Sequence, residues 1–305
     1  DEGVEVVGID NMNDYYDVRL KEFRLHSLRC HKNNSLFKFY KIDIEDMNSL
    51  DELFDSHKFD AVLNLAARAG VRYSMDNPDI YMSTNSQGTL NILNQMKKHE
   101  IKKFILASTS SLYAGQPMPY VESATVDKPI SPYAASKKSA ELLAYTYHYL
   151  YGIDVSILRY FTVYGPAGRP DMSVLRFIKW IDEGKPIKVF GDGSQARDFT
   201  YIDDIAKGTI KALMPLGYEI INLGGGKNPI SINQLIEIIE ETVGKKAIVE
   251  NLEFHKADMM GTWADISKAE KLLNWKPEVM LKEGIKKSVK WYLENDRFIK
   301  NTILI

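Results

Sequence analysis

The stretch Lys103-Phe104-Ile105-Leu106-Ala107-Ser108-Thr109-Ser110-Ser111 decides the fold, because it joins a short apolar run to four hydroxyl side chains. The run lacks the alternation of polar and apolar residues, which is typical of a strand covered by helices on both faces. The first half of the chain has further runs of this kind, at 4–9, 36–42, 61–65 and 154–160. Helical patterns separate them, at 18–30, 47–57, 80–99 and 132–151. This alternation predicts an α/β fold with a doubly wound parallel sheet, the Rossmann-like architecture, over residues 1–161.

The second half of the chain is more mixed. Helical patterns lie at 174–182, 203–213, 232–243, 267–273 and 281–294, and short strands are expected at 187–190, 219–223 and 247–250. Ser231 and Gln234 form a capping-box signature before an apolar run. We therefore expect residues 162–305 to form a smaller mixed α/β substrate domain, with elements near 201–224 returning to the sheet.

Composition excludes several classes of partner. With 39 Lys and Arg against 41 Asp and Glu, the net charge is −2, so neither nucleic acid nor a membrane surface is expected as a partner. The single cysteine, Cys30, rules out a disulfide within the chain and fits the reducing cytoplasm. The six histidines show no metal-ligand spacing, so no metal site is expected.

Asp10 follows the run at 4–9, where a carboxylate can bind both hydroxyls of an adenosine ribose. It would repel a 2′-phosphate and therefore favours NAD, although, for this residue taken alone, a turn or helix-cap aspartate is the more ordinary interpretation. The Gly-rich βα unit expected about 20 residues upstream is not in the sequence. We expect a fragment that lacks this unit, and whether it binds NAD or is active by itself stays open.

Tyr133 and Lys137, in Tyr133-Ala-Ala-Ser-Lys137, have the spacing that places two side chains on one helix face. A free phenol has a pKa of about 10, and a nearby ammonium group lowers it. The spacing alone is common on helix surfaces. Its weight comes from the hydroxyl cluster at 108–111, which can position a substrate hydroxyl.

A resemblance to a known family covers almost the whole chain. It is carried by Asn64-Leu-Ala-Ala67, Ser83-Thr-Asn-Ser-Gln-Gly-Thr-Leu-Asn91, Ser108-Thr-Ser-Ser-Leu-Tyr113, Ser131-Pro-Tyr-Ala-Ala-Ser-Lys137, Arg159-Tyr-Phe-Thr-Val-Tyr-Gly-Pro166, Arg197-Asp-Phe-Thr-Tyr-Ile-Asp-Asp204 and Asn274-Trp-Lys-Pro277. In this order the motifs resemble the extended short-chain dehydrogenase/reductases, in their NAD-dependent nucleotide-sugar epimerase and dehydratase branch. The stretch 162–172, with Gly-Arg-Pro-Asp-Met at its end, resembles the UDP-glucuronate 4-epimerases in particular.

The resemblance implies a role for each matching position. The expected catalytic residues are Thr109, Tyr133 and Lys137, with Tyr133 as the base on the sugar 4-hydroxyl. The residues expected to contact NAD are Asp10, Asn11, Asp43, Ile44, Ala66, Ala67, Asn85, Ser108, Tyr133, Lys137 and Tyr160. The residues expected to contact the UDP-sugar are Arg72, Ser110, Ser111, Thr162, Arg169, Arg197 and Asp258.

The resemblance also implies an isomerase that epimerises UDP-glucuronate to UDP-galacturonate through a 4-keto intermediate, and a homodimer through the helices at 80–99 and 132–151. Ser110 and Ser111 stand where the dehydratases carry an acid pair, so dehydration is not expected. A UDP-glucose 4-epimerase, a UDP-glucuronate decarboxylase, and a non-catalytic nucleotide-sugar-binding protein or inactive fragment stay open as alternatives.

Overall fold

The computed structural model of the chain describes residues 3–226, 229–254 and 258–300. The strands are β1 (Val6–Ile9), β2 (Phe37–Tyr40), β3 (Ala61–Asn64), β4 (Lys103–Thr109), β5 (Asp154–Tyr160), β6 (Val163–Tyr164), β7 (Pro186–Phe190), β8 (Ala196–Arg197), β9 (Thr200–Tyr201), β10 (Tyr218–Leu223), β11 (Ile230–Ser231) and β12 (Ile248–Leu252). The α-helices are α1 (Val18–Arg29), α2 (Met47–Ser56), α3 (Val71–Asp76), α4 (Pro78–Tyr81), α5 (Gly88–Lys98), α6 (Pro132–Tyr151), α7 (Ser173–Asp182), α8 (Ile202–Lys211), α9 (Ile232–Val243), α10 (Ser267–Leu273), α11 (Leu281–Glu294) and α12 (Asp296–Lys300). Short helices of other types are η1 (Asn34–Leu36), η2 (Met82–Gln87) and η3 (Ser110–Tyr113).

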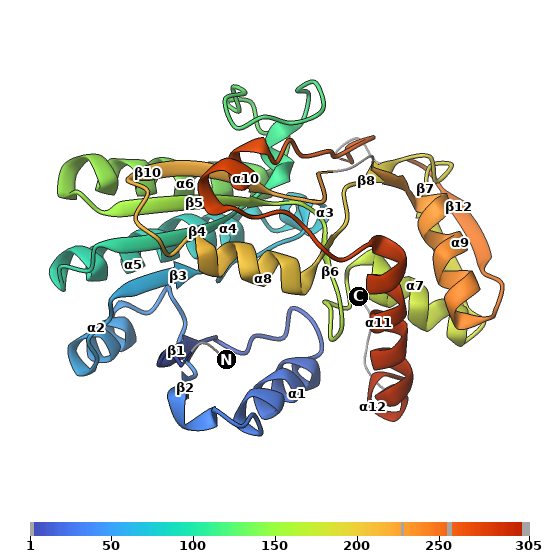
Figure 1. The fold of residues 1–305 in the computed structure, drawn as a ribbon, viewed down its shortest axis with the longest axis horizontal. Coiled ribbons are helices and arrows are strands. Elements are labelled where there is room, and N and C mark those ends of the chain that lie inside the picture. The colour runs from blue at the N-terminus through green and yellow to red at the C-terminus, as the bar shows by residue number, and fades with distance from the viewer. Residues whose placement is uncertain (1–2, 227–228, 255–257, 301–305) are drawn as a thin grey trace.

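The central sheet has the order β10-β5-β4-β3, and all of its strands are parallel. A second parallel pair, β1 and β2, lies beyond β3 (Figure 1). Every residue of β4 is buried, which agrees with a strand covered on both faces. The predicted doubly wound α/β fold is therefore confirmed.

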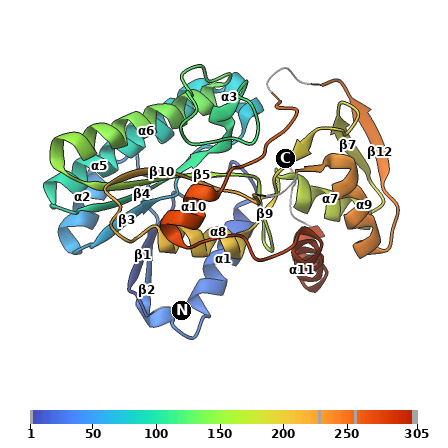
Figure 2. The same cartoon turned by 45° about the horizontal axis from the view of Figure 1, so that its top comes forward.

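The side chains of the central strands alternate between two apolar clusters. Phe104 and Leu106 of β4 pack with residues of α2, α5 and α6. Ile105, between them, faces Ile205 of α8 and Leu273 of α10 on the opposite side. Figure 2 shows α5 and α6 on one face of the sheet and α8 and α10 on the other. The sheet is thus the middle one of three layers, with helices packed on both of its faces.

A third apolar cluster lies to the side of the sheet, built mainly from α7, α9, α11 and β7 (Figure 1). Strand β12 pairs with β7 in parallel. The predicted capping box opens α9, where Ser231 and Gln234 exchange side-chain-to-backbone hydrogen bonds of 3.1 and 3.0 Å. Residues 218–223 nevertheless belong to the central sheet, because β10 pairs with β5.

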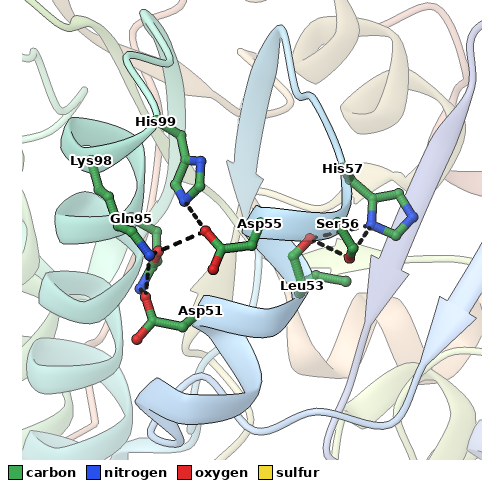
Figure 3. A network of polar contacts seen from close by, with 8 residues as sticks. All are labelled: Asp51, Leu53, Asp55, Ser56, His57, Gln95, Lys98 and His99. Carbon is green, nitrogen blue, oxygen red and sulfur yellow. Dashed lines mark hydrogen bonds and ion pairs between the residues drawn. The ribbon is translucent and has the colours of Figure 1, made fainter.

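Polar contacts join α2 to α5 on the outer surface (Figure 3). The Nζ atom of Lys98 lies 2.9 Å from Asp51 and 3.2 Å from Asp55, and His99 approaches Asp55 at 3.3 Å. Exposed pairs of this kind contribute little to stability. Within the described residues, no helix is both long and apolar enough to cross a membrane.

Candidate active site

The carboxyl end of β4 opens the site. Thr109 is the last residue of the strand, and its hydroxyl oxygen accepts a hydrogen bond of 3.1 Å from the backbone N–H of Ser111. This contact caps η3 and turns Ser110 and Ser111 away from the sheet into a cavity. The hydroxyl cluster predicted from the sequence therefore lies at a strand end, where ligands bind in parallel sheets.

Helix α6 brings Tyr133 to the same place. Ser131 caps the helix by accepting a hydrogen bond from Ala134, and Pro132 occupies its first turn, a favoured position for proline. Tyr133 follows at once, and its phenol lies close enough to the side chain of Thr109 for this contact to favour the phenolate. Lys137 lies one turn further along and is only 3% exposed. The structure thus brings together the three residues predicted to be catalytic.

Burial dominates the electrostatics of this group. It raises the pKa of Tyr133, while the polar contact with Thr109 and the positive charge of Arg169 act in the opposite direction. Burial also lowers the pKa of Lys137 to about 8, although the negative charge of Glu141 opposes this. Arg169 is therefore a cation that acts on the phenol, which the sequence pattern did not indicate.

A buried polar network supports the site from behind. Glu141, one turn beyond Lys137, accepts two hydrogen bonds from Arg159 of β5 and one of 2.6 Å from Ser108. Arg159 also donates to the hydroxyl of Tyr113, which in turn donates to Asn222 of β10. The network fixes β4, β5, β10 and α6 relative to one another. Sequence reasoning missed it, although Glu141 continues the four-residue spacing of Tyr133 and Lys137.

One cavity, of about 210 Å³, lies between β1 and β3, and we call it the β1–β3 cavity. It is lined by Ile9, Asp10, Asn11, Asn13, Tyr15, Tyr16, Lys21, Ile42, Asp43, Ile44, Leu65, Ala66, Ala67, Arg68, Ala69, Thr84 and Arg169. Six of the residues predicted to contact the cofactor are among them, namely Asp10, Asn11, Asp43, Ile44, Ala66 and Ala67. Carboxylates beside small and aliphatic side chains suit a ribose next to a flat apolar base. The chemistry of these residues fits an adenine nucleotide.

A second cavity, of about 140 Å³, lies beside Ser110, and we call it the hydroxyl cavity. Its lining consists of Val71, Ser110, Ser111, Ile130, Ser131, Thr162, Arg197, Asp258, Met259 and Thr262. Five of the residues predicted to contact the substrate lie here: Ser110, Ser111, Thr162, Arg197 and Asp258. The cavity thus offers neutral hydroxyl donors together with one cation, Arg197, and one carboxylate, Asp258.

Two further residues that were predicted to contact the substrate, Arg72 and Arg169, are not among the residues that line the hydroxyl cavity. Arg72 forms an ion pair with Asp258, and its guanidinium lies 3.5 Å from the centroid of the Phe190 ring. The pair links α3, beside the sheet, to the segment that follows β12 in the second half of the chain. Arg169 pairs with Asp171 and lines the β1–β3 cavity, so the structure places it on the predicted cofactor side.

The remaining predicted cofactor residues are engaged by protein groups. Asn85, which is 1% exposed, bonds the backbone N–H and C=O of Arg68 and the hydroxyl of Ser136. It lies in η2, a π-helical turn of a kind that is frequent at functional sites. Tyr160 shares a hydrogen bond of 2.9 Å with Thr209 of α8, and Ser108 donates to Glu141. These contacts position the loops around the cavities.

The arrangement is suited to proton transfer between a phenol and a ligand hydroxyl. Tyr133 can accept or donate one proton, and Thr109 can share the hydrogen bond to the same oxygen. Ser110, Ser111 and Thr162 supply neutral donors, each able to donate one hydrogen bond to an anionic group. Among the described residues that line the hydroxyl cavity, the carboxylate is that of Asp258, which is paired with Arg72.

Comparisons with known proteins agree with this geometry. The family described as GDP-mannose 4,6 dehydratase matches residues 1–288. The chain is 63% identical over 300 residues to a UDP-glucuronate 4-epimerase of Thermodesulfobacterium geofontis, covering 98% of this chain and 92% of the relative. It is 38% identical over 324 residues to a probable UDP-glucuronate 4-epimerase of Rhizobium meliloti, covering 99% and 94%. It also resembles the crystal structure of UDP-glucuronic acid 4-epimerase from Bacillus cereus with UDP-glucuronic acid and NAD, with 38% identity, a TM-score of 0.87 and coverage of 95% and 91%.

Proposed function

Because this chain belongs to the UDP-glucuronate 4-epimerase family, we propose that it is an isomerase that epimerises UDP-glucuronate at C4, with NAD as cofactor, to give UDP-galacturonate. The observation that carries the proposal is the contact between Thr109 and Tyr133 at the end of β4, beside a cavity lined by neutral hydroxyls. Such a site can exchange a proton with a sugar hydroxyl and hold an anionic sugar without supplying an acid for elimination.

In the proposed reaction, Tyr133 accepts the proton of the 4-hydroxyl and returns it to the 4-oxygen of the product. Thr109 donates a hydrogen bond that keeps the 4-oxygen in place during both transfers. Arg169 favours the phenolate form of Tyr133. Lys137, when protonated, would add to this effect, since positive charges stabilise an anion. NAD bound beside Tyr133 would supply the hydride acceptor for C4 and the hydride donor to the opposite face of the resulting 4-keto sugar.

The β1–β3 cavity is the proposed place of the adenosine half of NAD. Asp10 would accept hydrogen bonds from the ribose hydroxyls, with Asn11 and Asp43 beside it. Ile44, Ala66 and Ala67 would border the base. Asn85, Ser108 and Tyr160 are proposed to hold the surrounding loops and strand ends rather than to offer free polar groups.

The hydroxyl cavity is the proposed place of the sugar, with Arg72, Arg197 and Asp258 toward the UDP group. Ser110, Ser111 and Thr162 would donate hydrogen bonds to the C6 carboxylate. A 4-keto glucuronate is a β-keto acid and tends to lose CO₂, so an epimerase has to hold the carboxylate in a geometry that resists this loss. Neutral donors on several sides of the carboxylate are consistent with that requirement.

Nuclear magnetic resonance of the product mixture tests the function. We expect the protein, incubated with NAD and UDP-glucuronate, to produce UDP-galacturonate without release of CO₂. A UDP-pentose with CO₂ would identify a decarboxylase, and turnover of UDP-glucose alone would identify a UDP-glucose 4-epimerase; either result contradicts the proposal.

We further propose a homodimer through α5 and α6. The outer face of α6 exposes Leu142, Tyr145, Tyr149 and Leu150, a larger set of apolar side chains than a solvent-facing helix normally carries. Light scattering at micromolar concentration should give twice the mass of the chain, and Leu142→Glu with Tyr149→Glu should halve it. A monomeric mass for the unaltered protein contradicts the dimer.

The single cysteine supports the cytoplasm as the compartment of the protein.

The domain division is proposed on the same basis. Residues 1–161, with β10 and the adjoining segments, would bind NAD, and most of residues 162–305 would bind the UDP-sugar. The β1–β3 cavity, lined mainly by the first part, and the contribution of Arg197 and Asp258 to the hydroxyl cavity support this division.

A further inference from the structure

Lys21 is a buried lysine to which the proposed reaction gives no role. It lies in the first turn of α1, is only 8% exposed, and lines the β1–β3 cavity together with Asp10. Its Nζ atom lies 3.4 Å from a carboxylate oxygen of Asp10 and 5.1 Å from the centroid of the Tyr16 ring. A lysine side chain is seldom buried unless its charge is paired with an anion.

One carboxylate and two arginines act on the charge of Lys21. Burial lowers the pKa of Lys21, and the charges of Arg68 and Arg24 act in the same direction, while Asp10 opposes them. Arg24 is held by the carbonyl oxygen of Ala167, at 2.9 and 2.6 Å, and by the hydroxyl of Tyr16. Arg68 lines the cavity. Asp10 is thus the anion that contacts Lys21, and two arginines lie near enough to act on the charge of Lys21.

We propose that Lys21 is a cryptic ligand for a ribose 2′-phosphate, and that its pairing with Asp10 restricts the cavity to dinucleotides without that phosphate. The inference rests on the proposed function in one respect, namely that Asp10 meets the adenosine ribose. With Asp10 present, a 2′-phosphate meets a negative charge and has to displace that carboxylate from Lys21. Without Asp10, the ammonium of Lys21 is free to bind the phosphate through a charge-assisted hydrogen bond.

Lys21 would therefore be a specificity-determining residue in addition to Asp10. Removing only the Asp10 carboxylate should replace repulsion of a 2′-phosphate by attraction, because the ammonium of Lys21 already lies there, buried beside Tyr16. If Lys21 had no effect on the 2′-phosphate, removal of Asp10 would end the repulsion of the phosphate without adding any attraction. The two cases predict different behaviour for a variant that lacks both charges.

Calorimetric titration of nucleotide-free protein with NAD⁺ and with NADP⁺ separates these cases. The variants are Asp10→Ser, Lys21→Met and Asp10→Ser/Lys21→Met. Serine can still accept the hydrogen bond of 2.6 Å that Asp10 accepts from the backbone N–H of Met12. Methionine fills the buried volume of Lys21 without its charge.

We expect Asp10→Ser to bind NADP⁺ at least about tenfold more tightly than the unaltered protein, and the double variant to lose about tenfold of that affinity, with its NAD⁺ affinity unchanged relative to Asp10→Ser. Equal NADP⁺ affinity in the single and double variants would overturn the proposal. Equal losses for both dinucleotides in the double variant would also overturn it, because Lys21 would then contact a phosphate that both share.

Thermal unfolding of each variant checks that it is folded, and the Asp10→Asn and Asp10→Asn/Lys21→Met pair serves as a second comparison of the same shape. Unchanged NAD⁺ affinity in Asp10→Ser would overturn the placement of the ribose at Asp10 and the inference with it. Epimerisation of UDP-glucuronate by the unaltered protein would still be measurable, so the two failures are distinguishable.

Discussion

Arg159 and Glu141 form a bidentate ion pair inside the protein, with Nε–Oε1 and Nη2–Oε2 distances of 2.9 and 2.8 Å and only 1% exposure for each residue. Planar guanidinium and carboxylate groups match each other in this geometry. The pair joins β5 to α6 one helical turn from Lys137, so it supports the helix that carries Tyr133.

Removing one partner of this pair should destabilise the fold strongly. We expect Glu141→Gln to lower the free energy of unfolding by about 3–5 kcal/mol, because Arg159 would keep its charge without a counter-ion. Denaturant titration measures this. Glu241→Gln, which breaks the exposed pair between Glu241 and Lys282, is the control and should cause no measurable change. Equal effects of the two substitutions would contradict the prediction.

The same pair should make stability sensitive to acid. Burial alone would raise the pKa of Glu141, but the hydrogen bonds and charge of Arg159 outweigh it and hold the pKa below its ordinary value. The unfolded chain therefore binds a proton at a higher pH than the folded protein. The contribution of Glu141 is complete above its unfolded pKa and is lost as the pH falls through its folded pKa, so the stability gap between the unaltered protein and Glu141→Gln should shrink there.

Lys137 is expected to show the opposite behaviour. Burial lowers its pKa to about 8, so at neutral pH its charge costs the folded state about 3 kcal/mol. Lys137→Met should therefore raise the free energy of unfolding at pH 7 while it reduces turnover. Since the unfolded chain holds this proton up to higher pH, the gap between variant and unaltered protein should narrow as the pH rises from about 8 to about 10. A less stable variant at pH 7 would refute the prediction.

Tyr133→Phe should remove turnover but not binding. Loss of the proton acceptor is expected to slow epimerisation by about 10²- to 10⁴-fold, while the affinity for UDP, measured by calorimetry, stays nearly constant. Tyr147→Phe is the matched control on the same helix, because the hydroxyl of Tyr147 bonds Asn94 of α5 instead. Full turnover by Tyr133→Phe would exclude the phenol from the mechanism.

The sequence predicts the regular elements around the site well where local signals define their ends. Helix α6 runs from Pro132 to Tyr151 as predicted, because Ser131 and Pro132 begin it and Gly152, in the left-handed conformation, ends it. Helix α3 was missed, since no side chain caps its start and it depends on tertiary packing. The pattern at 80–99 was predicted as one helix but is divided by the π-helical turn η2.

At the site, the order of the strands predicts which residues lie close together. The positions of charged groups on long loops, such as Arg169, depend on tertiary contacts of those loops. Asp10, Thr109 and Ser110 follow strands, and parallel strands bring such residues to one edge. Arg169 follows no such rule. Its loop is held by Arg24, which donates to the carbonyl oxygen of Ala167, a contact between segments 143 residues apart. No local pattern indicates that contact, so the sequence identified Arg169 as a site residue but did not indicate its position near Tyr133.

The ion pair between Arg72 and Asp258 gives the last prediction, which concerns substrate affinity. Both residues are proposed to lie toward the UDP group, so Arg72→Met should remove a charge-assisted hydrogen bond to the diphosphate and raise KM for UDP-glucuronate by about 10- to 100-fold, with a smaller change in kcat. Steady-state kinetics measures both constants. Arg72→Lys keeps the charge but loses the planar contact with Phe190, so it should recover only part of the affinity. Lys207→Met, which breaks the exposed pair with Glu278, should leave KM unchanged. A KM for Arg72→Met equal to that of the Lys207 variant would remove Arg72 from the substrate site and leave the pair a link between α3 and the smaller region.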